Sequence, residues 1–147
     1  MTTLRIAAEL NNLETIRRHI EETAAALNVD PDMIPDVLLA VNEIATNVIV
    51  HGYRGRPGNI EIEIGQDGNN LVIRLRDQAP PFDPTSVPPP DTSLPLEQRP
   101  LGGMGIFLTR RLMDKVSYRV TRENGNELTL IKSIQSSSEE GTHESDP

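Results

Sequence analysis

Three polar residues, Glu43, Asn47 and His51, recur at every fourth position of the otherwise apolar stretch "LLAVNEIATNVIVHGY", residues 38 to 53. On an α-helix, residues four positions apart lie on one face, so these side chains form a polar stripe between apolar walls. Two interpretations are open. Either Glu43 and Asn47 hydrogen-bond to one another or to nearby backbone, or they line a functional site.

A second polar motif is the carboxylate of Asp77 in "RDQAPPFDP". Asp77 ends a predicted strand just as the chain leaves the sheet, and an acid at such a position can cap the turn that follows. At the mouth of an apolar cavity, the same carboxylate can accept a hydrogen bond from the exocyclic amine of a ligand. The local sequence leaves both interpretations of Asp77 open.

Three glycines, Gly102, Gly103 and Gly105 of "LGGMGIFL", open a predicted helix. Glycine lets a backbone approach a ligand closely, and the unpaired N–H groups at a helix N-terminus favour phosphate oxygens. Ordinary turn geometry also produces glycine clusters of this kind. The segment matches neither the strand-first Rossmann fingerprint nor a Walker A loop, because no Lys-Ser or Lys-Thr pair follows it.

The spacing of apolar residues predicts the elements that carry these motifs. The predicted order is strand, helix, helix, hairpin, loop, helix and hairpin, at residues 4–10, 13–28, about 35–51, 60–77, 78–103, 104–114 and 115–134. The loop holds eight of the twelve prolines, and loops of this length are commonly lids or disordered segments. We therefore expect an α/β two-layer sandwich: a mixed, largely antiparallel sheet of about five strands with helices on one face.

The length of 147 residues suits about one domain, which we place at residues 1–133, followed by an acidic tail at 134–147 that we expect to be disordered. The chain has no cysteine, no secretion signal and no run of about 18 apolar residues, so we expect a cytoplasmic protein with no membrane contact. Its formal net charge of −8 argues against binding nucleic acid.

Taken together and in this order, the three motifs resemble those of the Bergerat ATP-binding fold, which histidine kinases, Hsp90, gyrase and MutL share in the GHKL superfamily. Within that superfamily, "PFDP" and "GGMGIFLTRRLMDKVSY" resemble the anti-sigma factor serine/threonine kinases of the RsbW type. The resemblance covers residues 5 to 133 and leaves out the tail.

The resemblance implies that the chain binds ATP and Mg²⁺. Asn47 matches the asparagine that coordinates Mg²⁺, and its oxygen suits a hard cation. Glu43 matches the glutamate that acts as general base, and Asp77 matches the aspartate that binds the adenine amino group. The glycine-rich phosphate-binding box corresponds to Gly102, Gly103 and Gly105, and the ATP lid to about residues 84–101.

Other positions are less decided or depart from the family pattern. His51 either lies near the phosphates or simply ends the helix with a hydrogen bond, and Arg99 either contacts the γ-phosphate or is solvated. Ala79 replaces a usual glycine, and three prolines at 88–90 would stiffen the lid. Asn126 stands where related ATPases often have threonine, so we assign it no adenine contact.

The resemblance implies an ATP-dependent serine/threonine protein kinase that is also an anti-sigma regulatory factor. Such a protein sequesters a sigma factor and phosphorylates an antagonist of the sulfate-transporter/anti-sigma-antagonist (STAS) type. The alternative is an ATP-gated protein-binding module without phosphotransfer, and the retained Glu43 favours the kinase. A homodimer through the first strand and helix is a further expectation. Four basic residues either form a patch for an acidic partner or, as the default interpretation, belong to a solvated helix face: Arg110, Arg111, Lys115 and Arg119.

Overall fold

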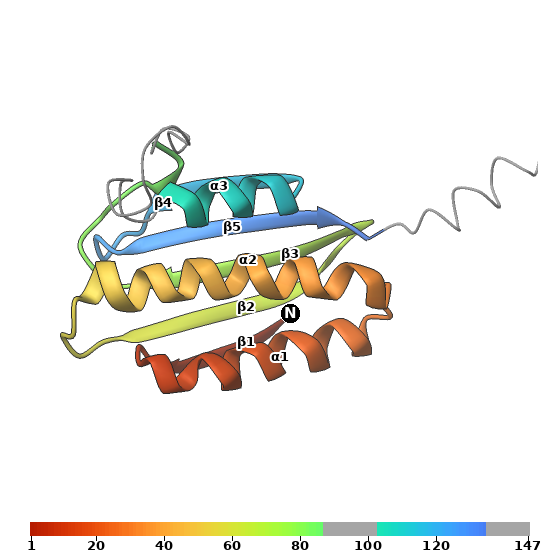
Figure 1. Ribbon diagram of the computed structural model, residues 1–147, viewed down its shortest axis with the longest axis horizontal. Coiled ribbons are helices and arrows are strands. Elements are labelled where there is room, and N and C mark those ends of the chain that lie inside the picture. Colours follow the sequence, from red (N-terminus) through yellow and green to blue (C-terminus); the bar gives the residue numbers. More distant parts are fainter. Residues whose placement is uncertain (87–102, 135–147) are drawn as a thin grey trace, which may run out of the picture.

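The computed structural model describes residues 1–86 and 103–134, and within them a five-stranded sheet carries three α-helices on one face (Figure 1). The strands are β1 Thr2–Ala7, β2 Asn59–Asp67, β3 Asn70–Asp77, β4 Lys115–Val120 and β5 Asn126–Ser133. The helices are α1 Leu13–Ala26, α2 Ile34–Asn47 and α3 Gly103–Leu112. The predicted two-layer architecture is confirmed.

The strands lie in the order β1-β2-β3-β5-β4, and each neighbouring pair is antiparallel. No parallel pair occurs among the described strands, so the sheet is more regular than the mixed one expected. The β2–β3 hairpin turns where the sequence predicts it: Asp67 pairs with Asn70, and Gly68 has a φ of +59°, which glycine adopts without strain.

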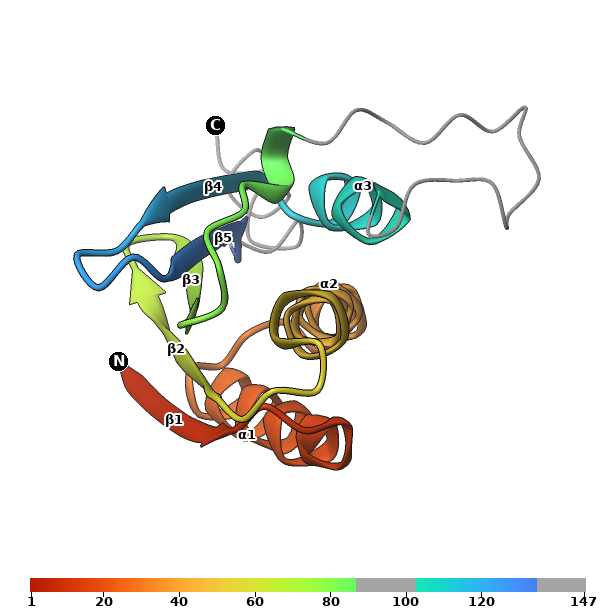
Figure 2. The ribbon, with the colours of Figure 1, turned by 90° about the vertical axis from the view of Figure 1, so that its left-hand side faces the viewer.

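The core lies between the sheet and the helices, as the end-on view in Figure 2 shows. Alternate residues of β2 and β3 point toward the helices and are at most 2% exposed: Ile60, Ile62, Ile64, Leu71, Ile73 and Leu75. Every third or fourth residue of α1 and α2 closes the other side: Ile16, Ile20, Ala24, Val37, Ala40, Val41, Ile44 and Ala45. The strands bury every second residue, and the helices bury every third or fourth. The apolar face of α2 therefore packs on the sheet, and the polar stripe of α2 lies beside the core.

The helical stretch Pro31–Tyr53 is long and apolar enough to pass a length and composition test for a membrane span, with a mean hydropathy of 1.5 over its best window. The sequence analysis found no such segment because Asn42, Glu43 and Asn47 interrupt the apolar run. The apolar face of α2 is buried against the sheet, which explains its composition as that of a core helix.

We expected the helix that carries the stripe to be one continuous α-helix as far as His51, and this prediction is wrong. It is α-helical through Asn47 and continues as a π-helix from Val48 to Tyr53, ending at Arg54 in a left-handed conformation with a φ of +54°. A π-turn changes the angular advance per residue, so the spacing rule that aligns Glu43 with Asn47 does not fix the direction of His51. π-turns occur frequently at functional sites.

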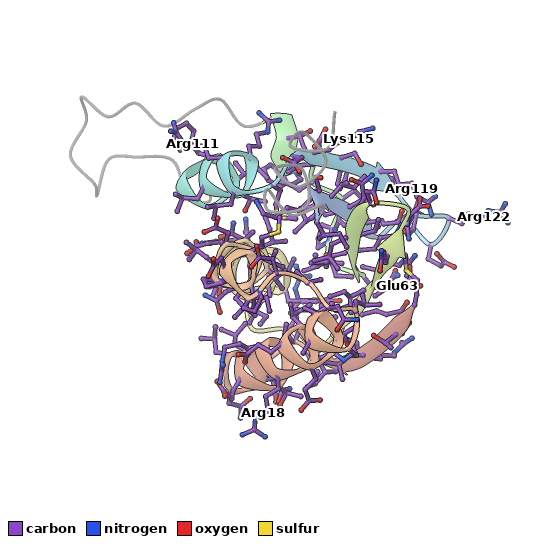
Figure 3. The ribbon with its side chains drawn as sticks, turned by 90° about the vertical axis from the view of Figure 1, so that its right-hand side faces the viewer. Arg18, Glu63, Arg111, Lys115, Arg119 and Arg122 are labelled. Atoms are coloured by element: carbon purple, nitrogen blue, oxygen red, sulfur yellow. The ribbon has the colours of Figure 1, made fainter. Side chains whose placement is uncertain are left out.

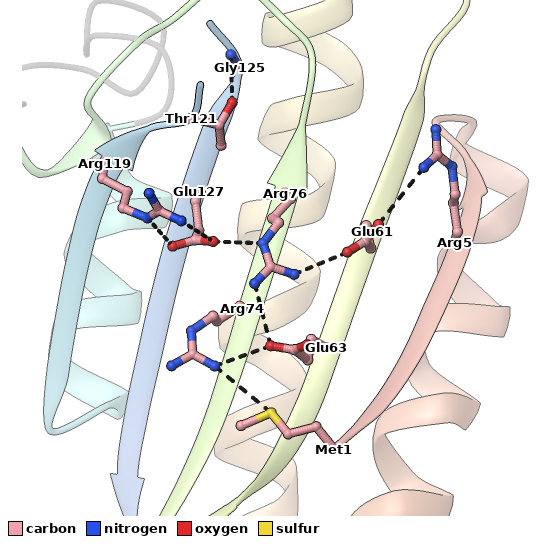
Figure 4. A network of polar contacts seen from close by, with 10 residues as sticks. All are labelled: Met1, Arg5, Glu61, Glu63, Arg74, Arg76, Arg119, Thr121, Gly125 and Glu127. Carbon is pink, nitrogen blue, oxygen red and sulfur yellow. Dashed lines mark hydrogen bonds and ion pairs between the residues drawn. The ribbon is translucent and has the colours of Figure 1, made fainter. Parts of the chain in front are cut away.

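The face of the sheet away from the helices carries a network of ion pairs (Figure 4). Glu127 lies between Arg76 and Arg119, with Oε2 2.6 Å from Arg76 Nε and Oε1 2.5 Å from Arg119 Nε. Arg76 also reaches Glu61 Oε1 at 3.0 Å and Glu63 Oε1 at 3.4 Å. The charges on this face largely pair with one another across β2, β3, β4 and β5.

Candidate functional site

One end of the molecule brings together the segments that carry the predicted motifs. The π-helix after α2, the end of β3, the start of β5 and the start of α3 all lie at the left of Figure 1. Asp77 pairs with Asn126 across β3 and β5. A Cβ added to Gly52 would lie 3.1 Å from the Cβ of Ala79, so the π-helix packs directly on the segment that follows Asp77.

Asp77 is only 6% exposed, and its Oδ1 accepts hydrogen bonds from Ala79 N at 2.9 Å and Asn126 Nδ2 at 2.8 Å. Burial raises the pKa of this carboxyl above its ordinary value, and the two hydrogen bonds partly offset that rise. The bond from Ala79 is the turn cap that the sequence left open. It uses one oxygen and leaves Oδ2 for a ligand.

Glu43 and Asn47 lie four residues apart within α2, on one half-buried face. Among the residues that the structure describes, neither side chain has a hydrogen-bond or ion-pair partner, and neither is fully buried without one. The interpretation in which they satisfy one another is therefore wrong. Their polar atoms remain accessible next to the core, as the second interpretation requires.

His51 lies within the π-helix, half-buried, and its side chain has no hydrogen-bond partner among the described residues. Its backbone oxygen accepts from Arg54 Nε at 3.2 Å. Of the two alternatives for His51, the helix-end hydrogen bond is therefore not made by its side chain within the described part of the chain.

The glycine box is placed in part. Gly103 is the first residue of α3 and Gly105 lies in its first turn, so both are at a helix N-terminus, as predicted. Gly102 lies outside the described residues, and so do Arg99, the prolines at 88–90 and most of the expected lid. The described start of that span is a short 3-10 turn, Pro84–Ser86, whose Thr85 backbone oxygen accepts from Arg110 Nη2 of α3 at 2.5 Å.

Tyr53, which does not stand out in the sequence, joins the segments around Asp77. Its hydroxyl donates to the backbone oxygen of Asn59 at 2.7 Å and accepts from Gln78 N at 2.8 Å. The ring is 5% exposed, and a Cβ on Gly58 would lie 2.2 Å from it. The sequence offered one hint of this role: Tyr53 follows Gly52 at the end of the predicted helix and precedes a glycine-rich loop.

Asn126 was also missed as a site residue. The sequence analysis assigned it no adenine contact because it replaces a threonine, yet its side-chain amide hydrogen-bonds directly to Asp77. Gly125 makes this approach feasible, since a Cβ there would lie 2.2 Å from the backbone oxygen of Asp77. The residue type at position 126 therefore matters for the aspartate, whether or not it touches a ligand.

A metal ion would need ligands beyond the protein at this site. No group of three or more histidine, aspartate or glutamate side chains within the described ranges could hold a metal by itself. Asn47 supplies an accessible amide oxygen, which is a hard donor. The residues present therefore fit a Mg²⁺ ion whose other ligands are triphosphate oxygens. Within the described part of the chain, they do not form a metal site made of protein side chains alone.

The four basic residues considered for one patch lie on two elements, Arg110 and Arg111 on α3 and Lys115 and Arg119 on β4. Arg111 stacks over the ring of Phe107 on α3, with 5.5 Å between the guanidinium carbon and the ring centroid. Figure 3 shows Arg111 on the helical layer and Lys115 and Arg119 along β4. Because Arg119 pairs with Glu127 on the opposite face of the sheet, these residues do not present one surface.

Comparison with known proteins places the chain among nucleotide-binding domains. The family model described as "Histidine kinase-like ATPase domain" matches residues 6–132. Serine-protein kinase RsbW of Bacillus cereus (strain AH820) is 30% identical over 136 residues, which cover 90% of this chain and 84% of that protein. The protein of the same name from Bacillus thuringiensis (strain Al Hakam) gives the same identity and coverage.

Solved structures share the fold at lower identity. The RsbU and RsbW domains of a Mycobacterium tuberculosis protein align with a TM-score of 0.59 at 18% identity, covering 91% of this chain and 33% of that chain. A chain of the SiaB–SiaC complex from Pseudomonas aeruginosa aligns with a TM-score of 0.53 at 14% identity, covering 91% and 90%. With the family match, the antiparallel sheet and three helices confirm the expected Bergerat fold.

Proposed function

Since this chain belongs to the histidine kinase-like ATPase domain family and to its RsbW-like serine-protein kinases, we propose that it is an ATP-dependent serine/threonine protein kinase and anti-sigma regulatory factor. The ATPase domain itself implies ATP binding. The observation that carries the proposal is the half-buried pair Glu43 and Asn47, which share one face of α2 and have no side-chain partner among the described residues. The π-helix that continues α2 packs on the segment that follows Asp77.

In this proposal, Asp77 accepts a hydrogen bond from the adenine amino group through Oδ2. Gly102, Gly103 and Gly105 bring backbone N–H groups close to the phosphates at the start of α3. Asn47 contributes an amide oxygen to a nucleotide-borne Mg²⁺, which when bound neutralises charge on the triphosphate.

Glu43 is the proposed general base. It takes the proton from a serine or threonine hydroxyl of a partner protein while that oxygen bonds to the γ-phosphorus and the bond to the β–γ bridging oxygen breaks. The products are the phosphorylated partner and ADP. A module that only binds partners in an ATP-dependent way needs no base at this position, which is why the kinase is favoured over the gated binder.

The proposed partners are a sigma factor, which the protein sequesters, and a STAS-type antagonist, which it phosphorylates. The named relatives are serine-protein kinases, and one structural neighbour was solved as a complex of two proteins, SiaB and SiaC. Sigma factors act on transcription, so this role implies a cytoplasmic location. A homodimer through β1 and α1 remains part of the proposal.

The decisive experiment follows label from γ-labelled ATP with Mg²⁺ onto candidate STAS-type antagonists. We expect transfer to a partner serine or threonine by the wild-type protein and a loss of about 10²- to 10⁴-fold in Glu43→Gln, with ATP affinity retained. Glu123→Gln, at an exposed position of the turn between β4 and β5, is the matched control and should transfer normally.

Two results would contradict the proposal. Tight ATP binding with no label on any partner, and equal partner capture by wild type and Glu43→Gln, would favour the ATP-gated binding module. Failure of the wild-type protein to bind ATP would reject both functions.

A further inference from the structure

Asn126 lies beside Asp77 at the first position of β5, and its surroundings point to a role in choosing the nucleotide base. We propose that Asn126, braced by Tyr118, is a positioning residue that orients Asp77 and so sets a preference for purines with an amino group at the 6-position. This inference rests on the proposed function, because it takes Asp77 to be the group that contacts the base.

The side-chain amide of Asn126 bonds to groups from separate parts of the chain. Its Nδ2 donates to Asp77 Oδ1 at 2.8 Å and to the backbone oxygen of Ala79 at 3.1 Å. Its Oδ1 accepts from Phe82 N at 3.0 Å and from the hydroxyl of Tyr118 at 2.5 Å. A flipped amide would turn its NH₂ group toward the Phe82 N–H, which can only donate, so these contacts define the orientation.

These contacts use the full hydrogen-bonding capacity of Asn126. An asparagine side chain offers two N–H donors and two acceptor lone pairs. Here two donors occupy the lone pairs, and three acceptors share the two N–H groups, since Nδ2 also lies 3.4 Å from the backbone oxygen of Pro80. Nothing remains with which Asn126 could bind a base directly. Its effect on a ligand therefore passes through Asp77, which is why we describe Asn126 as a positioning residue and not as a binding residue.

The carboxylate of Asp77 is held so that only one oxygen is available. Oδ1 accepts from both Asn126 Nδ2 and Ala79 N, and rotation of the carboxylate would break both bonds. Oδ2 accepts no hydrogen bond from the described residues. It is also not one of their fully buried atoms without a partner, so it remains open to a ligand. A ligand at this point must supply a donor, as a 6-amino group does and a 6-carbonyl does not.

The hydrogen bonds of Asn126 also fix the backbone segment that follows Asp77. The carbonyl of Ala79 and the N–H of Phe82 both bond to Asn126, so the segment between them is tied to the β4–β5 hairpin. Tyr118 comes from β4 and Asn126 from β5, while Asp77 comes from β3. Base recognition by a residue on β3 thus depends on side chains of the two neighbouring strands.

The test compares the binding of ATP with that of inosine triphosphate, which has a carbonyl in place of the 6-amino group. We expect wild type to prefer ATP. Asp77→Asn should abolish this preference, because an amide N–H can replace the accepting oxygen. Asn126→Asp keeps the size but places a second carboxylate beside Asp77 in place of the N–H donor. The repulsion between the two groups releases Asp77 from its orientation, so the ratio of ATP affinity to inosine triphosphate affinity should fall roughly tenfold or more.

The matched control is Asn124→Asp, the same chemical change at an exposed turn residue of the same hairpin, and it should leave the ratio unchanged. If Asn126→Asp fails to fold by circular dichroism, Tyr118→Phe takes its place. It removes one of the contacts that orient the amide and should lower the same ratio by a smaller factor.

An affinity ratio that stays at the wild-type value in the folded variant would overturn the inference, because a merely structural Asn126 would weaken both triphosphates alike. Failure of the proposed function gives a different result. In that case the wild-type protein would bind neither triphosphate, or would show a preference that Asp77→Asn does not alter.

Discussion

The methyl group of Ala79 faces Gly52 of the π-helix, and a Cβ at Gly52 would lie only 3.1 Å from it. Ala79 is 2% exposed, so its side chain is packed against the helix end. Ala79 stands where the family usually has a glycine, and its added methyl group fills space that Gly52 leaves open.

This contact predicts that the effect of Gly52→Ala depends on residue 79. In the wild-type background the new methyl group is overpacked against Ala79, and we expect a loss of about 1 to 3 kcal/mol in the free energy of unfolding. In an Ala79→Gly background the clash is removed and the gain in helix propensity remains, so the loss should shrink by about 1 kcal/mol or more. Urea unfolding of the four proteins measures this coupling; additive effects of the two substitutions would contradict it.

Much of the fold could be predicted from the sequence because each element has a strong period. The alternating isoleucines of residues 60–64 and the helical spacing of Ile16, Ile20 and Ala24 predict which faces are buried, and all are buried. The order of strands could not be read in this way. Placing β5 between β3 and β4 depends on pairing between distant segments, which local patterns do not encode.

Candidate-site residues could be singled out from the sequence where a polar side chain interrupts an apolar pattern, and not where contacts cross elements. Glu43, Asn47 and Asp77 stand out as polar residues at apolar positions. Tyr53 and Asn126 look ordinary in the sequence, because their importance comes from bonds to Gln78 and Asp77, far away in the chain. The π-turn was also beyond prediction, since Val48 to Tyr53 have no composition that separates it from an α-helix.

A prediction for Asn47 concerns the metal. Asn47→Ala should weaken ATP binding in the presence of Mg²⁺ by about tenfold, because one hard oxygen ligand is lost, and should leave binding in EDTA nearly unchanged. Isothermal titration of ATP with and without Mg²⁺ gives both values. Asn42→Ala, at an exposed position on the same helix, is the control. Equal weakening in both buffers would show that Asn47 acts on the nucleotide without the metal.

Asp77→Asn should separate binding from stability. Burial raises the pKa of Asp77, so the folded state holds a proton on this carboxyl more tightly than the unfolded chain does. The contribution of Asp77 to the free energy of unfolding therefore falls as the pH rises from the ordinary pKa of 3.8 through the raised value. Relative to Asp77→Asn, wild type should be most stable at acid pH and lose that advantage toward neutral pH.

The measurement is urea unfolding of both proteins between about pH 3.5 and pH 7, in the pH range where an aspartate titrates. Above the raised pKa, the variant is expected to be at least as stable as wild type, although it should have lost its preference for ATP. This combination is typical of a residue kept for binding at some expense of stability. A wild-type advantage that grows with pH would contradict the assignment.

The contribution of Glu127 to the free energy of unfolding has the opposite pH dependence from that of Asp77, and Glu127 lies on the other face of the sheet. The hydrogen bond from Arg119, with Arg76 on its other side, holds the pKa of Glu127 below its ordinary value of 4.5. Its stabilising contribution is therefore present above that value and lost as the pH falls through the lowered one.

Glu127→Gln keeps the shape but removes the charge, and should cost about 1 to 2 kcal/mol near neutral pH, because each arginine remains partly solvated. Glu123→Gln, an exposed turn position, should change stability by less than about 0.5 kcal/mol. If Glu127→Gln and Glu123→Gln have the same unfolding free energy at pH 7, the network in Figure 4 contributes nothing measurable to the fold.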